Sequence, residues 1–446
     1  MNQKLILLFI LFSCMVLQAQ EPKDNYVFSL QQAIEHGLKY NVTAINAGKD
    51  VEASKKKKWE TTTMGLPQIN AGIDYQRNFA IQQSIIPAEF LGGEPGEFVE
   101  VAFGTRHTAL ARATLSQLIF DGSYLVALQA SKTYLNFYEN LKVKTERDLR
   151  EQIVNAYTSA LLVDESISIL EKNKATLDKN LSETKEIYKN GLTEEESVEQ
   201  LTITLASVDN SLRNMQRLKT ISYNMLKIQL GLELEDQLIL TDPLDQLTLQ
   251  HVMPMSSESV FDINNNIDYQ LVLNNEEQKR LLMLQEKSMA LPSLSANLNF
   301  GYNAFSQQFD FLNRDARWLN FSSLGMSLNI PIFSSLGRTA RTQQAKIEME
   351  KAKLEKEDFQ KKLNLQFQQS FSEYEFSIEN YNTNKSNLRL AERIEGKQQI
   401  KFKEGLSTSF EFTEAQRQLY GAQQDYLQSM VEVINKKAAL EKILNQ

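Results

Sequence analysis

The chain has 446 residues, of which 17 are Gly and 8 are Pro, fewer of each than globular proteins usually contain. Its net charge of −8 argues against a nucleic-acid partner, and the lysine run 55–58 fits a solvated helix face better than a binding patch. Long stretches almost without Gly or Pro exclude sandwiches, doubly wound sheets and propellers, because these folds need frequent turns. The composition therefore predicts very long helices.

Residues 1–19 have the pattern of a secretory signal peptide. Lys4 precedes an apolar run over residues 5–17, and the small residue Ala19 ends the segment. A short buried helix is the alternative, but a polar stretch follows directly and disfavours it. The chain is therefore expected to be exported. No later segment resembles the 18 or more apolar residues of a transmembrane helix, which leaves a soluble protein, a surface-bound protein or a β-barrel.

Cys14 is the only cysteine of the chain. Removal of the leader would leave a mature protein without cysteine, which must be held together by packing or oligomerisation rather than by disulfides. The segment 11–14, Leu-Phe-Ser-Cys, also allows a lipoprotein cleavage site at which Cys14 is acylated, although Phe12 fits that pattern poorly. Both alternatives stay open.

After the leader, the first half is expected to hold an N-terminal helix (20–66), a β-hairpin (67–120) and a long helical hairpin (121–232). A second, weaker strand of the hairpin is expected around 107–118, and the Pro- and Gly-rich stretch 85–101 is expected to be a long loop. The first strand shows the period-two alternation of apolar residues that is typical of strands, at Ile69, Ala71, Ile73 and Tyr75.

The helical hairpin follows the helical period. Apolar residues keep a spacing of three and four, broken only by Lys174, along a helix expected from about Ser123 to Lys189. At 1.5 Å per residue this helix would span about 100 Å. The spacing continues on the return helix, which predicts coiled-coil packing of antiparallel neighbours rather than a cofactor site.

The second half repeats this order. A linker (233–266) leads to a helix (267–291), a second β-hairpin (292–333) and a second long helical hairpin (334–446). Its two strands alternate strictly, at Leu294, Ala296, Leu298, Phe300 and Tyr302, and at Leu324, Met326, Leu328 and Ile330. An internal duplication is also indicated by three recurring motifs: Met-Gly-Leu-Pro (64–67) and Met-Ala-Leu-Pro (289–292), Ile-Phe (119–120 and 332–333), and Tyr-Lys-Asn-Gly-Leu-Thr (188–193) and Phe-Lys-Glu-Gly-Leu-Ser (402–407).

Strands with an apolar face opposite a face of Asn, Ser, Gly and Gln suit a barrel wall between lipid and water. An ordinary half-buried sheet is the alternative, and a single strand alone would favour it. Four such strands on an exported chain favour the barrel. Because four strands cannot close a barrel and open edges cannot exist in lipid, chains must pool their strands. Two chains would give eight strands and a filled interior, whereas three would give twelve strands and a lumen.

Several motifs in this order resemble the TolC-like outer-membrane efflux protein family. They are the opening segment 28–41, the Leu-Pro pairs before the first and third strands, Gln-Leu-Ile-Phe-Asp-Gly (117–122), Pro-Ile-Phe (331–333), and the Gly-Leu-Thr and Gly-Leu-Ser turns. The resemblance implies a mainly α fold with a membrane β-barrel portion: a homotrimer whose twelve-stranded barrel is continued by a tunnel of long helices. The linker 233–266 resembles the segment around the waist of that tunnel.

The resemblance also implies the function and the partners. Proteins of this family are exit ducts of tripartite efflux pumps and type I secretion systems, so a location in the outer membrane with a long periplasmic extension is expected. Such a duct meets a periplasmic adaptor (membrane fusion) protein and, through it, an inner-membrane transporter of the RND, ABC or a similar class. The sequence does not specify the cargo, because the transporter selects it.

Two turns match the family's periplasmic tips, which adaptors grip. A simpler interpretation is that the glycines of these turns only end the helices, because a chain that reverses after a helix needs a residue with positive φ. Ending a helix and binding an adaptor are compatible roles. The tip residues are Gly191, Leu192 and Thr193 in the first turn, and Gly405, Leu406 and Ser407 in the second.

Glu411 and Glu414 lie just past the second turn, on one helix face. Their placement matches the acidic constriction of the family, and threefold symmetry would turn them into rings of carboxylates that favour cations. Burial among like charges should raise their pKa. Solvated surface glutamates are the alternative.

The first half departs from this pattern. At the position where better-known members of the family have an acid, this chain has Ser197, directly after Glu196. No Arg follows Gly405 within the second turn, which puts the family's salt-bridge latch in doubt. Tyr188 has a hydroxyl that can bond across the tip, whereas Phe402 has none. The gate candidates are therefore Glu411, Glu414, Tyr188 and Glu196.

Enzymatic function is not expected. His36, His107 and His251 are scattered without metal-ligand spacing, and the GxSxG, P-loop and dinucleotide motifs are missing, so neither a metal nor a cofactor is predicted. The main alternative to a channel is a periplasmic coiled-coil scaffold or adaptor without a barrel. That alternative accounts for the long helices but leaves the four amphipathic strands unexplained.

Overall fold

A computed structural model describes residues 25–252 and 261–444 of the chain. The expected leader with Cys14 and part of the expected linker lie outside these residues. The described chain forms two compact units, and each is described by itself. The first unit holds residues 25–50, 139–252, 261–271 and 357–444, and the second holds residues 51–138 and 272–356.

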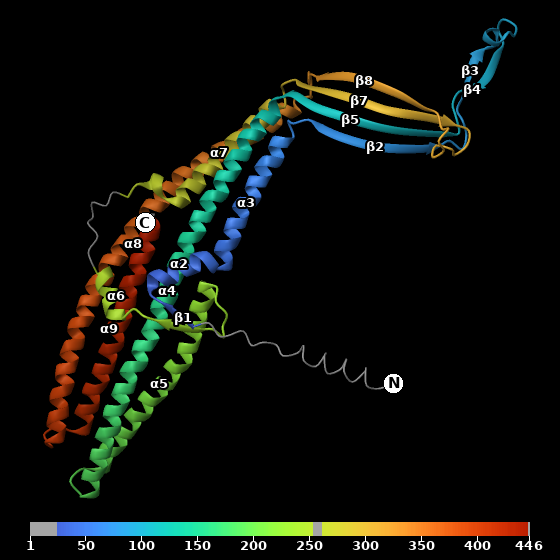
Figure 1. Ribbon diagram of the computed structural model, residues 1–446. Helices are drawn as coiled ribbons and strands as arrows, with labels where there is room; N and C mark the ends of the chain where they lie inside the picture. The colour runs from blue at the N-terminus through green and yellow to red at the C-terminus, as the bar shows by residue number, and fades with distance from the viewer. Residues whose placement is uncertain (1–24, 253–260, 445–446) are drawn as a thin grey trace, which may run out of the picture. The chain divides into compact units, whose positions relative to one another are not determined.

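Two helical hairpins of matching length make up most of the helical structure (Figure 1). The first consists of α4 (Gly122–Lys189) and α5 (Glu195–Leu230), with 68 and 36 residues. The second consists of α8 (Gly337–Lys403) and α9 (Ser409–Leu444), with 67 and 36 residues. The agreement in length supports the internal duplication that the recurring motifs indicate.

In the first unit these helices bury a continuous apolar core, as their spacing predicts. Its fully buried members include Ile153, Tyr157, Leu226, Leu230, Ile434 and Leu440. Lys174, the polar seam position of α4, forms an ion pair with Asp209 of α5. Among the described residues, α4 also holds an 18-residue stretch apolar enough to cross a membrane by composition, which the sequence interpretation did not anticipate. The chain itself buries 44% of that stretch, and core helices pass the same test.

The N-terminal helix expected as one segment is two helices that follow a short strand. The elements are β1 (Asn25–Phe28), α2 (Leu30–Tyr40) and α3 (Val42–Thr63). Asn41 ends α2 because its backbone is extended, with φ −65° and ψ 132°. Its side-chain amide donates to the backbone oxygen of Gln229 at 3.0 Å. The break in the helix therefore fastens α2 to the end of α5.

The region between the two halves contains ordered short elements. They are β6 (Gln237–Leu240), α6 (Leu244–His251) and a 3₁₀ turn, η3 (Ile263–Asn265), followed by α7 (Ile267–Ser288). β6 pairs in parallel with β1. The carboxylate of Asp242 accepts hydrogen bonds from the backbone of Leu30 at 2.6 Å and from the hydroxyl of Tyr157 at 3.2 Å. These bonds join the region to the start of α2 and to α4.

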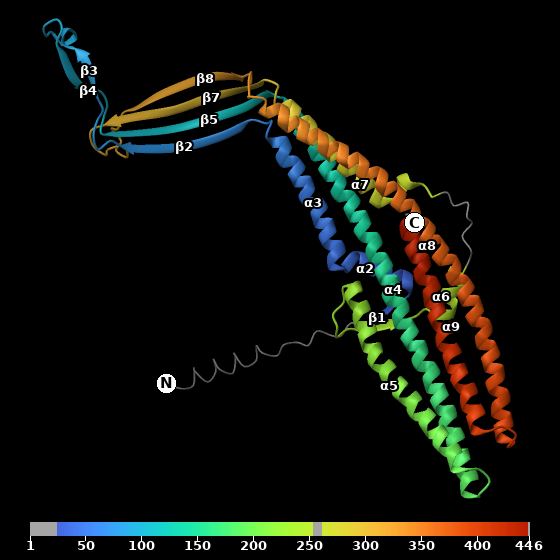
Figure 2. The same cartoon turned by 180° about the vertical axis from the view of Figure 1, so that it is seen from behind.

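The second unit contains a four-stranded antiparallel sheet built from the two expected hairpins (Figure 2). In order across the sheet, the strands are β2 (Gln68–Arg77), β5 (His107–Asp121), β7 (Ser293–Ser306) and β8 (Trp318–Asn329). β5, expected to be the weaker strand, is the longest of the four, with 15 residues. The two halves meet where β5 pairs with β7, and β2 and β8 form the two edges of the sheet.

The register gives this sheet one apolar and one polar face. Ile69, Leu115, Leu298 and Leu324 form one cross-strand row on the apolar face. Asn70, Thr114, Asn299 and Ser323 form the neighbouring row on the polar face, where Thr114 donates to Asn299 at 2.8 Å. On the apolar face, Ile69 and Leu324 are each 73% exposed. The described chain therefore leaves much of this face uncovered.

The stretch 85–101 corrects one expectation, because it is not a long loop. Most of it lies in a small second hairpin, in which β3 (Gln83–Pro87) pairs antiparallel with β4 (Phe98–Ala102) and a 3₁₀ turn, η2 (Ala88–Leu91), follows β3. Gly92 and Gly96 have φ of 83° and 94°, values that favour Gly. The glycines and Pro95 that suggested a loop thus lie in the connection between the two strands, and Pro87 is the last residue of β3.

Candidate functional site

The two expected tips are the turns between α4 and α5 and between α8 and α9, which both lie in the first unit. Gly191 and Gly405 have left-handed backbones, with φ of 72° and 69°. The backbone N–H groups of Leu192 and Leu406 donate back to helix carbonyls at 3.1 and 2.8 Å. Both turns are therefore the same glycine-terminated helix end.

A groove of about 720 Å³ lies between the two tips. Leu192, Thr193, Gly405 and Ser407 line it, together with Glu196. The two matching leucines of the tips, Leu192 and Leu406, are 77% and 78% exposed. Exposed leucines on both tips, of which Leu192 also lines the groove, form a surface on which another protein can pack.

The helices that follow the two tips begin differently. At the start of α9, the backbone N–H of Thr408 donates to the carboxylate of Glu411 at 3.0 Å, and the backbone N–H of Glu411 donates to the hydroxyl of Thr408 at 3.2 Å. This reciprocal pair is a capping box. At the start of α5, Glu194 occupies the cap position without a side-chain hydrogen bond. Only the second hairpin therefore has a capped helix at its tip.

Within one chain, the capping box sets the direction in which the pKa of Glu411 shifts. In the single chain this carboxylate is exposed, and hydrogen bonds from the Thr408 backbone and the Ser407 hydroxyl hold its pKa below the usual range. A carboxylate that accepts hydrogen bonds is favoured in its charged form. The raised pKa expected for a ring of carboxylates in a trimer stays a prediction, and within one chain the cap at Thr408 lowers the pKa of Glu411 instead.

The cap makes part of the stability depend on pH. Folding lowers the pKa of Glu411, so its ionised form stabilises the folded state at pH values above the ordinary glutamate pKa of about 4.3. This contribution is lost as the pH falls through the lowered pKa of the folded state.

The variant Glu411→Gln tests this contribution, because it keeps the capping geometry but removes the charge. We expect the wild type to melt at a higher temperature than Glu411→Gln at about pH 7, and the difference to vanish well below about pH 4. Circular dichroism melts measure this. Glu357→Gln, at an exposed position of α8, is the control, and a difference that persists in acid would contradict the assignment.

The other gate candidates are also exposed in the single chain. Glu414 forms an ion pair with Arg417 at 2.7 Å, and Glu196 accepts a hydrogen bond from Gln200 at 3.2 Å. Tyr188 is 40% exposed, and its hydroxyl forms no hydrogen bond within residues 25–252 and 261–444. One chain does not bring these four candidates together into a closed constriction.

Two features near the tips were missed by the sequence interpretation. Phe402 stacks on Phe412, with ring centroids 5.0 Å apart and an interplanar angle of 10°, so its role is apolar packing behind the tip. Glu395 of α8 is half-buried, and burial raises its pKa. Its charge adds to the burial that raises the pKa of Tyr420. The aromatic spacing could have revealed the first feature, but nothing in the sequence sets Glu395 apart from the many surface glutamates.

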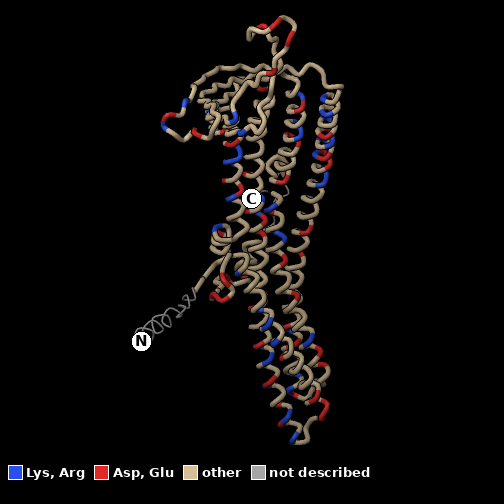
Figure 3. Tube along the Cα trace, turned by 90° about the vertical axis from the view of Figure 1, so that its right-hand side faces the viewer, with Lys and Arg blue, Asp and Glu red and all other residues tan. Residues whose placement is uncertain are grey.

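The four-stranded sheet of the second unit is the other candidate site. β7 and β8 contain no Asp, Glu, Lys or Arg, whereas charges are spread along the helices (Figure 3). At the end of the sheet away from α3 and α4, aromatic rings cluster: Tyr75 lies 5.3 Å from Phe309, and Phe311 lies 6.1 Å from Trp318. An apolar band bounded by aromatic rings is typical of strands that cross a membrane.

The three histidines occupy separate places. His36 and His251 bond backbone oxygens of Leu230 and Leu247, at 3.1 and 2.7 Å, and His107 bonds the hydroxyl of Tyr75 at 2.7 Å. Within the described residues, no three His, Cys, Asp or Glu side chains gather as metal ligands do.

Residues 278–446 match the family model described as Outer membrane efflux protein. No curated protein sequence matches the chain. Among solved structures, the outer membrane protein VceC from Vibrio cholerae is 15% identical with a TM-score of 0.73, and the match covers 93% of this chain and 96% of that one.

Two further structures are similar to a comparable degree. The CmeC outer membrane channel of Campylobacter jejuni is 16% identical, with a TM-score of 0.73 and coverage of 93% of this chain and 85% of that one. The open state of the MtrE outer membrane channel of Neisseria gonorrhoeae is 15% identical, with a TM-score of 0.72 and coverage of 93% and 88%. The match of residues 278–446 and the shared fold confirm that this chain resembles the TolC-like outer-membrane efflux protein family, as its motifs predict.

Proposed function

We propose that this protein is an outer-membrane channel, the exit duct of a tripartite efflux or type I secretion system. The observation that carries the proposal is the four-stranded sheet with one apolar face and two edges, β2 and β8. In lipid every backbone polar group must be paired, so each edge needs a strand from another chain. Three copies would place β8 of one chain beside β2 of the next and close a twelve-stranded barrel with a lumen.

The dimensions of the sheet support this arrangement. β2 and β8 have 10 and 12 residues, close to the 9–11 or so that a tilted membrane strand needs. The polar row of Asn70, Thr114, Asn299 and Ser323 would then line the lumen, and the apolar row would face lipid. Outer-membrane channels with this fold support a location in the outer membrane, with the helices in the periplasm.

The helical hairpins would form the tunnel and its docking end. We assign the tips, Gly191 to Thr193 and Gly405 to Ser407, to the contact with a periplasmic adaptor. The adaptor would in turn recruit an RND, ABC or similar transporter of the inner membrane. The exposed leucines of the two tips and the groove between them support this assignment. The transporter would select the cargo, which this chain therefore leaves undefined.

Glu411 and Glu414 are proposed as the gate, with Tyr188 and Glu196 beside them. In a trimer the two acids of each chain would form rings that attract cations. We expect the double variant Glu411→Gln, Glu414→Gln to have a lower cation-to-anion permeability ratio, measured from reversal potentials in a salt gradient across a planar bilayer. Glu235→Gln, an exposed acid between α5 and β6, should leave the ratio unchanged. Equal ratios for the wild type and the double variant would rule out the gate.

A single pair of labelled variants tests the barrel against the alternative of a periplasmic scaffold. Whether Cys14 is cleaved off or acylated, the mature chain has no other cysteine, so Leu324→Cys and Ser323→Cys each introduce a unique thiol. We expect a fluorophore at 324 to be quenched by a quencher attached to lipid, and one at 323 to be quenched by aqueous iodide. A scaffold without a barrel would expose both positions to iodide.

A further inference from the structure

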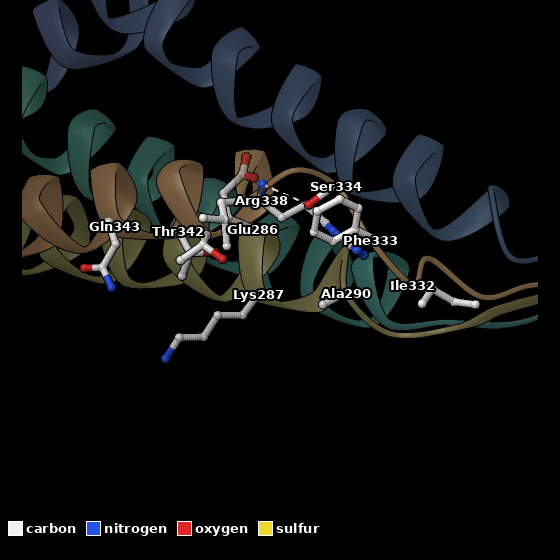
Figure 4. Close-up of a pocket in the computed structure, with 11 residues that line it drawn as sticks. Glu286, Lys287, Ala290, Ile332, Phe333, Ser334, Arg338, Thr342 and Gln343 are labelled. Atoms are coloured by element: carbon white, nitrogen blue, oxygen red, sulfur yellow. Dashed lines mark hydrogen bonds between the residues drawn. The ribbon is translucent and has the colours of Figure 1, made fainter.

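A cavity of about 390 Å³ lies in the second unit where β8 leads into α8 (Figure 4). One wall is formed by Glu286 and Lys287 at the end of α7 and by Ala290 just after it, and the other by the turn 332–336 and the first residues of α8. The residues of the tips, the gate candidates and the polar row of the sheet do not line this cavity. The cavity is therefore separate from the sites described above.

The cavity carries positive charge that the described chain does not neutralise. Glu286 is engaged by Arg341 at 3.2 Å. Lys287 and Arg338 form no ion pair within the described residues, and the Nη1 atom of Arg338 is buried there without a hydrogen-bond partner. A buried donor without a partner is unfavourable, and a guanidinium is best satisfied by a carboxylate or a phosphate that accepts two hydrogen bonds. The buried Nη1 atom of Arg338 therefore favours an anionic ligand.

The apolar rim of the cavity continues the apolar face of the sheet. On β8 this face carries Leu324, Met326 and Leu328, and the same alternation runs on through Ile330 to Ile332 at the cavity. Ile332 and Phe333 are 89% and 81% exposed. A ligand in this cavity would thus have apolar surface on one side and cations on the other.

The turn that shapes the rim is conformationally demanding. Ser335 and Leu336 have φ of 48° and 63°, in the left-handed region that residues other than Gly rarely adopt. This turn holds Leu336 outward, 71% exposed, beside Phe333. Backbone strain of this kind is concentrated at functional sites, where the surroundings maintain it.

We infer that the cavity binds the phosphate of a phospholipid, with the Arg338 guanidinium on the headgroup and the acyl chains along Ile332 and Phe333. The inference rests on the proposed function, which puts the sheet in the outer membrane and this end of it at the inner leaflet. Cationic side chains below an apolar band lie at the depth of lipid phosphates. A phosphate-bearing lipid would anchor each chain at the junction between barrel and tunnel.

Native mass spectrometry of the purified protein tests the inference. The probes are phosphatidylglycerol, diacylglycerol with the same acyl chains but no phosphate, and inorganic phosphate as a competitor. We expect the wild type to retain phosphatidylglycerol about tenfold more strongly than diacylglycerol, because the charge-assisted bonds are specific to the phosphate. Arg338→Gln should lose this preference, and Arg338→Lys should keep part of it. Lys346→Gln, an exposed cation two turns further along α8, should behave as the wild type.

Four outcomes would overturn the inference. They are equal retention of the two lipids, equal losses in Arg338→Gln and Lys346→Gln, displacement of the lipid by inorganic phosphate, and a wild-type oligomer that retains no lipid because a second copy of the chain covers the cavity. The same spectra report the oligomer mass. A trimer without bound lipid would overturn this inference alone, whereas the absence of a trimer would count against the proposed function.

Discussion

Replacing Leu324 by Arg should prevent assembly of the barrel. Leu324 lies in the middle of β8 on the apolar face, opposite Leu298 of β7, and the chain leaves it 73% exposed. If lipid covers this face, Arg near the bilayer centre costs about 2–4 kcal/mol in each chain. We expect the yield of heat-modifiable oligomer in outer-membrane extracts, measured on gels with and without boiling, to fall at least about tenfold.

Ser323→Arg is the matched control, one residue away and on the opposite face of the same strand. The same charge then points into a water-filled lumen, and the oligomer should form at nearly the wild-type yield. Equal damage by both substitutions would mean that the two faces are equivalent, which contradicts a barrel wall. Equal tolerance of both would mean that lipid does not cover the apolar face.

Replacing Gly231 by Ala should destabilise the first unit strongly. Gly231 ends α5 with φ of 73°, and a Cβ atom there would lie 2.4 Å from the backbone oxygen of Tyr40. The left-handed backbone costs about 1–2 kcal/mol for a residue with a side chain, and the overlap with rigid backbone adds about 1–3 kcal/mol. We expect a loss of about 3 kcal/mol in the free energy of unfolding, measured by denaturant titration of helical circular dichroism.

Gly191→Ala and Gly405→Ala separate the two contributions. Both glycines have nearly the same φ as Gly231, but a Cβ atom at either tip would meet nothing within 4 Å. Each should therefore cost only the backbone term of about 1–2 kcal/mol. If Gly231→Ala were no worse than the tip variants, the contact between the end of α5 and the end of α2 would not be as close as we describe.

The helical part of the fold was the most predictable from sequence. Long helices with apolar residues at a spacing of three and four leave few alternatives, and the glycine turns mark their ends, because only Gly adopts φ near 70° without strain. The break at Asn41 was not predicted, since it depends on the hydrogen bond to Gln229 in α5, a contact distant in sequence.

The strands were predictable where their alternation was strict and less so elsewhere. β7 and β8 alternate apolar with polar residues, whereas the apolar side of β5 carries the small residues Ala109, Ala111 and Ala113, and Leu110 interrupts its polar side. The β3–β4 hairpin was missed because Pro87 ends one of its strands and glycines form its connection. Pro and Gly signal a turn equally well in a loop and in a hairpin.

The candidate site was predicted in position but not in local detail. The tip residues fall on the two turns, as expected from their glycines. The sequence Thr-Ser-Phe-Glu at 408–411 carries the capping-box signature, which could have been recognised without a structure. The ion pair of Glu414 with Arg417 was similarly visible as a spacing of three on a helix. The sequence of one chain cannot position side chains of neighbouring chains, so the closed gate stays a prediction.

Conductance of the purified protein in a planar bilayer tests the central claim most directly. We predict discrete current steps of one amplitude after insertion, as expected for a single defined pore through a trimer. The protein should first be verified as a folded, heat-modifiable oligomer, so that absence of current cannot be due to misfolding. A verified oligomer that inserts into the bilayer and carries no current in any voltage range would contradict the channel.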